Sequence, residues 1–248
     1  MGRRKNKEAT DQYFTDFSEK YQDIPKFPQE KRFNIKVNPL TENQKRLMDL
    51  LKHKNIIISL GPAGVGKSYI AMAHASKMLA LEKYEKLILT RTSIPTGKSL
   101  GFFPGTVTEK LTPWLTQYIS YLKTFLGNST VDIWLKERPN KPEKIILQPL
   151  ETVRGMSWEN TIVLVEEAQN LTWSEILMLS TRIHDNSLLI FSGDIRQRDI
   201  QNSGIETLLN LTKKYGIEGI GVVNFTSEDI VRSPLVKAII QAVEEEGL

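Results

Sequence analysis

Residues 61–68 read Gly61-Pro62-Ala63-Gly64-Val65-Gly66-Lys67-Ser68, a full match to the pattern Gly-x-x-x-x-Gly-Lys-Ser/Thr. An apolar run at residues 55–60 precedes this octapeptide, and an alanine-rich helical stretch follows it. In such a strand-loop-helix setting, backbone N–H groups surround a phosphate and the helix directs its positive end at the anion. The octapeptide, with Tyr69 just beyond it, therefore predicts a nucleoside triphosphate site; the alternative is a glycine-rich turn without a ligand.

Two side chains of this loop have separate expected roles. Lys67 would add a positive charge between the β- and γ-phosphates, and the Ser68 hydroxyl would hold Mg²⁺. The sequence therefore predicts Mg²⁺ as the cofactor of this site.

The composition is that of an ordinary globular protein. The 248 residues are 40% hydrophobic and 25% charged, enough for one large α/β domain and too few for two ATPase cores. Lys and Arg number 33 against 29 Asp and Glu, and the resulting net charge of +4 permits nucleic-acid binding without requiring it. The chain has no Cys and three His, which excludes disulfides and disfavours zinc, so a cytoplasmic location is expected. No run reaches the roughly 18 apolar residues of a membrane span, so no membrane association is expected.

Short apolar runs recur along the chain and predict a mostly parallel sheet. Helical segments separate them, as the crossovers between parallel strands require. We expect a doubly wound, RecA-like α/β domain over residues 39–248, with helices on both faces, after a basic and partly ordered extension at residues 1–38. The predicted strands lie at residues 55–60, 86–90, 144–148, 161–165, 187–192 and 220–225.

Helix starts and loops are predicted from local signals. Thr172 and Ser203 each precede a Glu at capping-box spacing, and Ser233 precedes a proline suited to a first helical turn. Glycines and prolines between residues 91 and 113 indicate a long functional loop, and residues 124–143 are expected to form a surface excursion.

Acidic and polar residues follow two of the predicted strands. Glu166 is expected to serve the metal through a bound water, and Glu167 to orient or deprotonate the attacking water. After the next strand, Gln197 could sense the γ-phosphate, and Asp194 could orient it or the water. The alternatives are helix-start acids for the first pair and turn formers for the second.

The order of the motifs resembles the PhoH (phosphate-starvation-inducible) ATPases over about residues 39–243. The resemblance rests on the octapeptide together with Leu100-Gly101-Phe102-Phe103-Pro104-Gly105, Glu166-Glu167-Ala168-Gln169-Asn170, Ser192-Gly193-Asp194-Ile195-Arg196-Gln197 and Val231-Arg232-Ser233-Pro234. It implies a core similar to the first motor domain of superfamily 1 helicases, ATP as the substrate of hydrolysis, coupling to RNA or single-stranded DNA, and a homo-oligomeric ring, with a hexamer favoured. The family usually has Asp-Glu in place of Glu166-Glu167, so nucleotide binding with slower turnover is expected.

A glutamine near the start of the domain resembles the glutamine motif of superfamily 1 enzymes. Its amide could read the adenine edge as donor and acceptor together. Gln44 could equally serve only its own helix, since it follows Thr41 at capping-box spacing.

Several cationic and aromatic residues are candidates for charge stabilisation or strand binding. Arg232 is the first choice for an arginine finger and Arg182 the second, ahead of Arg91 and Arg154, and the finger would act in trans if a second copy closes the site. Arg91, Lys98, Phe102 and Phe103 are the candidate nucleic-acid contacts, although the phenylalanines could simply anchor their loop. Trp114, Tyr118 and Tyr121 have the spacing of a core stripe.

Three functions are compatible with these motifs. The first is an ATPase that remodels RNA or single-stranded DNA in a helicase-like manner. The second is a nucleotide-gated binding or oligomerisation protein with slow turnover. The third is a small-molecule kinase, which would also need an acceptor pocket.

Overall fold

The computed structural model describes residues 33–246 apart from residues 34, 93–106, 138–141 and 154. Within these residues six parallel strands form one sheet in the order β3-β2-β4-β5-β1-β6. Each predicted apolar run contains one strand, which confirms the α/β fold class. The strands are β1 (Ile56–Leu60), β2 (Lys86–Arg91), β3 (Ile145–Leu147), β4 (Thr161–Glu166), β5 (Leu188–Gly193) and β6 (Ile220–Asn224).

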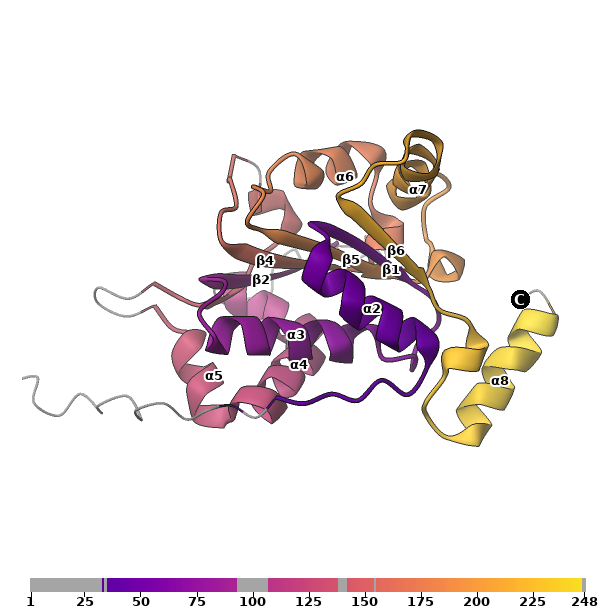
Figure 1. Ribbon diagram of the computed structural model, residues 1–248, viewed down its shortest axis with the longest axis horizontal. Coiled ribbons are helices and arrows are strands. Elements are labelled where there is room, and N and C mark those ends of the chain that lie inside the picture. The colour runs from indigo at the N-terminus through magenta and orange to yellow at the C-terminus, as the bar shows by residue number, and fades with distance from the viewer. Residues whose placement is uncertain (1–32, 34, 93–106, 138–141, 154, 247–248) are drawn as a thin grey trace, which may run out of the picture. The chain divides into compact units, whose positions relative to one another are not determined.

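Helices cover both faces of the sheet (Figure 1). Alternate strand residues point to opposite faces, so Ile57 packs on the side of α2 and α3, while Ile58 packs on the side of α6 and α7. None of the described helices is long and apolar enough to cross a lipid bilayer. The helices are α2 (Glu42–His53), α3 (Lys67–Ala80), α4 (Val107–Leu126), α5 (Asn128–Trp134), α6 (Trp173–Ser180), α7 (Gly204–Tyr215) and α8 (Pro234–Glu245), with short 3₁₀ turns η1 (Leu150–Val153), η2 (Ala168–Asn170), η3 (Ile195–Gln197) and η4 (Ser227–Asp229).

The strand order brings three loops together at one edge of the sheet. β5 lies between β1 and β4, and the parallel register pairs Leu60 with Gly193 and Val165 with Phe191. The carboxyl ends of these three strands are therefore level. Ligands of open α/β sheets bind at this edge, and here it carries the octapeptide and the predicted acids.

The structure corrects two predicted loops. Helix α4 begins at Val107 and contains Pro113, so residues 107–113 are helical despite the lost hydrogen bond. Burial of Leu111 and Leu115 on the core side of α4 offsets that loss. The surface excursion predicted for residues 124–143 was wrong over α5, which starts after Gly127 (φ 82°) and buries two of its residues, Val131 and Trp134.

The predicted helix starts also have mixed outcomes. Thr172 forms a capping box with Glu175, and Ser233 caps α8 with proline in its first turn, as expected. Ser203 is the N-cap of α7, but its side chain makes no capping hydrogen bond; Glu206 instead accepts from Arg198 Nη1 at 2.9 Å. The capping box predicted there was wrong. Residues 1–32 lie outside the described part, so the division at residue 38 stays a prediction.

Candidate nucleotide-binding site

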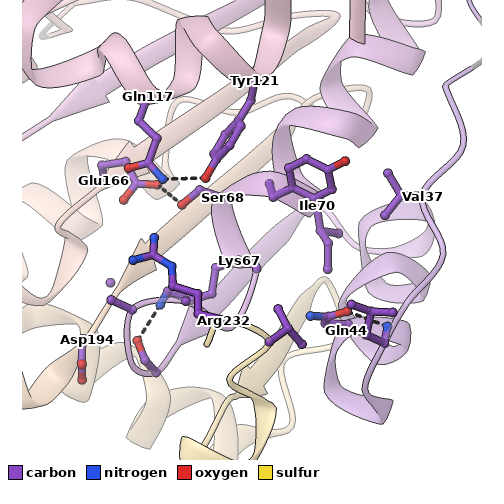
Figure 2. Close-up of a pocket in the computed structure, with 18 of the residues that line it drawn as sticks. Val37, Gln44, Lys67, Ser68, Ile70, Gln117, Tyr121, Glu166, Asp194 and Arg232 are labelled. Carbon is purple, nitrogen blue, oxygen red and sulfur yellow. Dashed lines mark hydrogen bonds between the residues drawn. The ribbon is translucent and has the colours of Figure 1, made fainter. Parts of the chain in front are cut away.

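A cavity of 390 Å³ opens at the carboxyl ends of β1, β4 and β5, within the usual size of small-molecule sites. It brings together most of the predicted site residues. Figure 2 shows Gln44 and Val37 at one end of this cavity and Glu166 and Asp194 at the other. The lining includes Gln44, Gly61, Ala63, Gly64, Gly66, Lys67, Ser68, Tyr69, Gln117, Tyr121, Glu166, Glu167, Gly193, Asp194, Gln197 and Arg232.

The loop between β1 and α3 needs its glycines. Gly61, Gly64 and Gly66 have φ values of 140°, 90° and 90°, a region that other residues rarely adopt. A Cβ atom on Gly61 would also lie 2.5 Å from the carbonyl oxygen of Phe225. The conformation of the loop therefore favours glycine at all three positions, of which the octapeptide pattern requires Gly61 and Gly66.

Lys67 binds its own loop in this structure. Its Nζ donates to the carbonyl oxygens of Gly61 at 2.5 Å and Pro62 at 2.8 Å. Burial lowers the pKa of the Lys67 ammonium, and the nearby charges of Glu166 and Asp194 oppose that shift. An arriving phosphate would therefore replace loop carbonyls as the partner of a cation already in position.

Ser68, Glu166 and Tyr118 form a cluster of oxygen atoms beside the loop. Ser68 Oγ donates to Glu166 Oε1 at 3.2 Å and lies 3.3 Å from the Tyr118 hydroxyl (Figure 2 shows the first contact). Burial raises the pKa of Glu166 to about 7, although the Tyr118 hydroxyl and the Lys67 charge act in the opposite direction. Hydroxyl and carboxylate oxygens are ligands that suit Mg²⁺, so the donor set fits this ion.

Tyr118 belongs both to the core, as its spacing in the aromatic stripe predicts, and to the site. It is buried, but its hydroxyl reaches the cluster while Gln117 and Tyr121 of the same helix line the cavity. Gln117 Nε2 donates to the Tyr121 hydroxyl at 2.6 Å. A polar Gln within an aromatic stripe was the one signal that this face of α4 meets a polar site.

Glu167 is held at both carboxylate oxygens. It has a left-handed backbone (φ 55°), its Oε1 lies 3.4 Å from Arg91 Nη2, and its Oε2 accepts from Gln169 Nε2 at 2.7 Å. Gln169 is fully buried, and its Oε1 accepts from the backbone N–H of Asp194 at 3.1 Å. This amide therefore links the end of β4 to the end of β5, a role that the sequence analysis did not assign.

Gly193 makes room for that amide. A Cβ atom at this position would lie 2.2 Å from Gln169 Oε1. The absence of a side chain at the end of β5 therefore permits the link to Glu167.

Asp194 and Gln197 line the cavity and also shape the turn after β5. Asp194 Oδ1 accepts from the backbone N–H of Arg196 at 3.2 Å, and Gln197 Nε2 donates to Asp194 Oδ2 at 3.2 Å. Arg196 also pairs with Glu244 of α8. The turn-forming alternative is thus realised, while the γ-phosphate roles of Asp194 and Gln197 stay predictions.

Gln44 connects helix α2 to the loop. Its Nε2 donates to the Val65 carbonyl at 3.0 Å, and its Oε1 accepts from the Leu40 N–H at 2.7 Å. Thr41 Oγ1 caps the helix by accepting from the Gln44 N–H at 3.3 Å. The alternative that Gln44 serves only its own helix was wrong, and the amide keeps one donor hydrogen and one lone pair for a base. Adenine reading stays a prediction.

The candidate cations occupy different places. Arg232 lines the cavity of its own chain, its Cδ 2.9 Å from where a Gly64 Cβ would stand. Arg182 Nη1 donates to the Met156 carbonyl at 2.8 Å, beyond the amino end of β4, so it cannot reach the nucleotide of its own chain. Outside the described residues lie Lys98, Phe102, Phe103 and Arg154.

Tyr69 forms part of the cavity wall beside α4. Its ring meets Tyr121 edge-on with centroids 5.4 Å apart, and it stays 37% exposed. Such a ring is available to a nucleotide base.

The family follows from a comparison with known proteins. The family model described as PhoH-like protein matches residues 36–244. The chain belongs to this family. A PhoH-like protein of Bacillus subtilis (strain 168) is 34% identical over 209 residues, 84% of this chain and 64% of that protein. Protein PhoH of Escherichia coli (strain K12) is 32% identical over 202 residues, 81% of this chain and 56% of that protein. The PhoH-like chain thus spans less than two thirds of either relative.

Solved structures similar to this PhoH-like chain include phage terminases. The large terminase of a thermophilic bacteriophage, solved in complex with ADP, has a TM-score of 0.54 at 13% identity over 82% of this chain and 50% of that chain. The HK97 bacteriophage large terminase has a TM-score of 0.54 at 13% identity, over 86% of this chain and 48% of that chain. At such identities the likeness bears on the fold alone.

If Glu166 holds Mg²⁺, its carboxyl predicts that binding of the ion by this PhoH-like chain depends on pH. An acid with a pKa near 7 is mostly neutral at pH 6 and mostly ionised at pH 8, and only the ionised form attracts Mg²⁺. We expect the apparent affinity for Mg²⁺, titrated with ATP bound, to rise about tenfold from pH 6 to pH 8 and then level off. Glu166→Gln should reduce this rise to the part that comes from ionisation of the terminal phosphate of ATP. A flat profile in the unchanged protein would contradict the prediction.

Proposed function

We propose that this chain binds ATP with Mg²⁺ and hydrolyses it, and that hydrolysis is coupled to RNA or single-stranded DNA. One observation carries the ATPase part of the proposal: the same cavity is lined by Lys67 and Ser68 of the loop and by Glu166 and Glu167. The coupling to a strand is proposed from the resemblance to the family. A phage terminase of similar fold was solved with ADP, which supports a nucleotide as the ligand.

The residues divide the work of phosphoryl transfer to water. Loop N–H groups and Lys67 would bind the β- and γ-phosphates, and Ser68 and Glu166 would hold Mg²⁺, which neutralises charge on the phosphate oxygens. Glu167 would orient the attacking water and take its proton as the water oxygen bonds to the γ-phosphorus. The bond from that phosphorus to the β-phosphate oxygen breaks, giving ADP and phosphate. Arg232, Gln197 and Asp194 would surround the γ-phosphate.

An ATPase assay with Mg²⁺, with and without RNA and single-stranded DNA, tests this function. We expect steady phosphate release that increases when a strand is added. Tight ATP binding without turnover would instead favour the nucleotide-gated binding protein. Phosphate transferred to a small acceptor would establish a kinase.

We expect Glu166→Asp to increase turnover, up to about tenfold, because phosphoryl transfer is sensitive to positioning on the ångström scale. Glu166 already reaches to 3.2 Å from Ser68 Oγ, and the shorter Asp usual in the family leaves more space for an ion between them. The measurement is kcat at saturating Mg²⁺ and ATP. Glu167→Asp makes the same one-methylene change at the neighbouring acid and should lower kcat. A fall in kcat for Glu166→Asp would contradict the prediction.

We also propose that copies of the chain assemble into a homo-oligomeric ring, with a hexamer favoured. One observation supports it: α8 exposes an apolar stripe in which Leu235, Ile239 and Val243 are 69%, 54% and 42% exposed. Arg232, which lines the cavity, shortly precedes α8 in the chain. A second copy that bound at the apolar stripe would bury it. Light scattering tests the assembly, and Ile239→Asp should reduce the mass. A monomer with full ATPase activity would overturn the proposal.

A further inference from the structure

Trp114 is the exposed member of the α4 stripe that faces the site. Trp114, Gln117, Tyr118 and Tyr121 follow the spacing i, i+3, i+4 and i+7, which places them on one side of the helix. The last three reach the cavity or the Ser68 cluster, whereas Trp114, one turn earlier, is 51% exposed. A single exposed ring has little meaning by itself, so its contacts decide what it can do.

Among the described residues, Trp114 contacts Arg91, the arginine that also pairs with the proposed catalytic acid. The Arg91 guanidinium carbon lies 4.9 Å from the centroid of the Trp114 ring, a cation–π arrangement. The same guanidinium places Nη2 3.4 Å from Glu167 Oε1. One cation at the end of β2 therefore joins the exposed Trp114 side chain to the proposed catalytic carboxylate.

Another anion could displace Glu167 from its ion pair with Arg91. A charge-assisted hydrogen bond of good geometry is about 2.7–2.9 Å long, and the Arg91–Glu167 ion pair is longer, at 3.4 Å. A phosphate offers a guanidinium two oxygens in the planar geometry it favours. A phosphate close to Trp114 would therefore compete well with Glu167 for Arg91.

We propose that Trp114 is a stacking platform for one unpaired base of single-stranded RNA or DNA, and that the phosphate beside this base draws Arg91 away from Glu167. Aromatic side chains bind bases of any sequence by stacking, which suits a strand bound without sequence preference. The inference rests on the proposed function, because it concerns the acid that would activate water.

The exchange would make hydrolysis respond to the strand. Without a strand, the Arg91 guanidinium lies 3.4 Å from one oxygen of Glu167 and competes with water for it, while Gln169 donates to the other oxygen. Release by Arg91 frees the first oxygen, while Gln169 still holds the carboxylate in place. We therefore expect the strand to speed hydrolysis, because it releases Glu167, a general base that is already positioned.

The test combines strand binding with intrinsic fluorescence. A fluorescein-labelled single strand of RNA or DNA is titrated with the full chain, and anisotropy and tryptophan emission are recorded. We expect the strand to quench tryptophan emission, Trp114→Ala to weaken affinity about 5- to 100-fold, and Trp114→Phe to keep most of the affinity while losing the quench. Comparison of RNA with DNA identifies the strand.

The matched control is Tyr215→Ala. Tyr215 is 65% exposed, and Lys214 Nζ lies 5.2 Å from its ring centroid, so it makes the same kind of cation–π contact. It lies at the end of α7, which leads to the amino end of β6. This variant should bind and hydrolyse like the unchanged protein. Thermal melting by circular dichroism checks that each variant is folded.

Arg91→Ala separates the release of Glu167 from strand affinity. We expect its strand-free hydrolysis to rise, and the ratio of rates with and without strand to fall toward one. If the unchanged chain never hydrolyses ATP, the proposed function fails, while the fluorescence titration still reports on Trp114. If the strand stimulates hydrolysis and Trp114→Ala keeps both affinity and stimulation, this inference alone is overturned.

Discussion

Glu167→Gln should remove nearly all ATP hydrolysis while leaving ATP affinity within about threefold. A positioned general base contributes roughly 10²- to 10⁴-fold to rate, and the amide cannot take the proton of the water. The amide has almost the shape of the acid, so its oxygen can still accept from Gln169, and the phosphate loop is untouched. The measurements are kcat by phosphate release and Kd for ATP by calorimetry.

Glu159→Gln is the control for this change. Glu159 precedes the same strand, is exposed, and lies outside the cavity, so its loss of charge should alter neither quantity. Unchanged hydrolysis in Glu167→Gln would move the general base to another residue, such as Asp194, which also lines the cavity.

Lys67→Ala should abolish tight binding of ATP. Removing one partner of a buried charge pair typically costs about 2–5 kcal/mol, which corresponds to roughly 30-fold or more in affinity. The substitution also removes the two hydrogen bonds from Lys67 to the Gly61 and Pro62 carbonyls, but the positive φ angles of the loop glycines and the Val65 contact of Gln44 should still hold the loop in its course. Calorimetric titration with ATP and Mg²⁺ measures the loss.

Lys77→Ala is the matched control, since Lys77 is an exposed cation on the same helix, α3. Its affinity for ATP should equal that of the unchanged chain. Tight ATP binding by Lys67→Ala would mean that backbone N–H groups alone hold the phosphates, and the role assigned to the ammonium would have to be withdrawn.

Much of the fold and the phosphate-binding half of the site could be predicted from the sequence. Buried parallel strands are nearly continuous apolar runs, so each of the six was recognisable without knowledge of its neighbours. The glycines of the octapeptide determine the geometry of its loop, and acids that directly follow a buried parallel strand lie at the carboxyl end of the sheet. Local pattern and tertiary position agree in these elements.

The contribution of α4 could not be predicted in this way. An aromatic stripe at helical spacing has the same pattern whether it faces a core or a polar site, and only the packing of α4 on α3 decides that Tyr118 reaches Ser68. Arg232 is a similar case, because sequence alone does not distinguish an arginine that lies on its own loop from one that reaches a neighbouring copy. The link through Gln169 depends on a backbone N–H of another strand.

Because Gln169 lies so close to Gly193, the residues at these two positions constrain each other in evolution. Any side chain at 193 would push the amide out, and without the amide Glu167 would lose the partner that fixes its orientation. Random libraries screened for turnover should therefore return these two residues unaltered together, or substituted together alongside a new support for the acid.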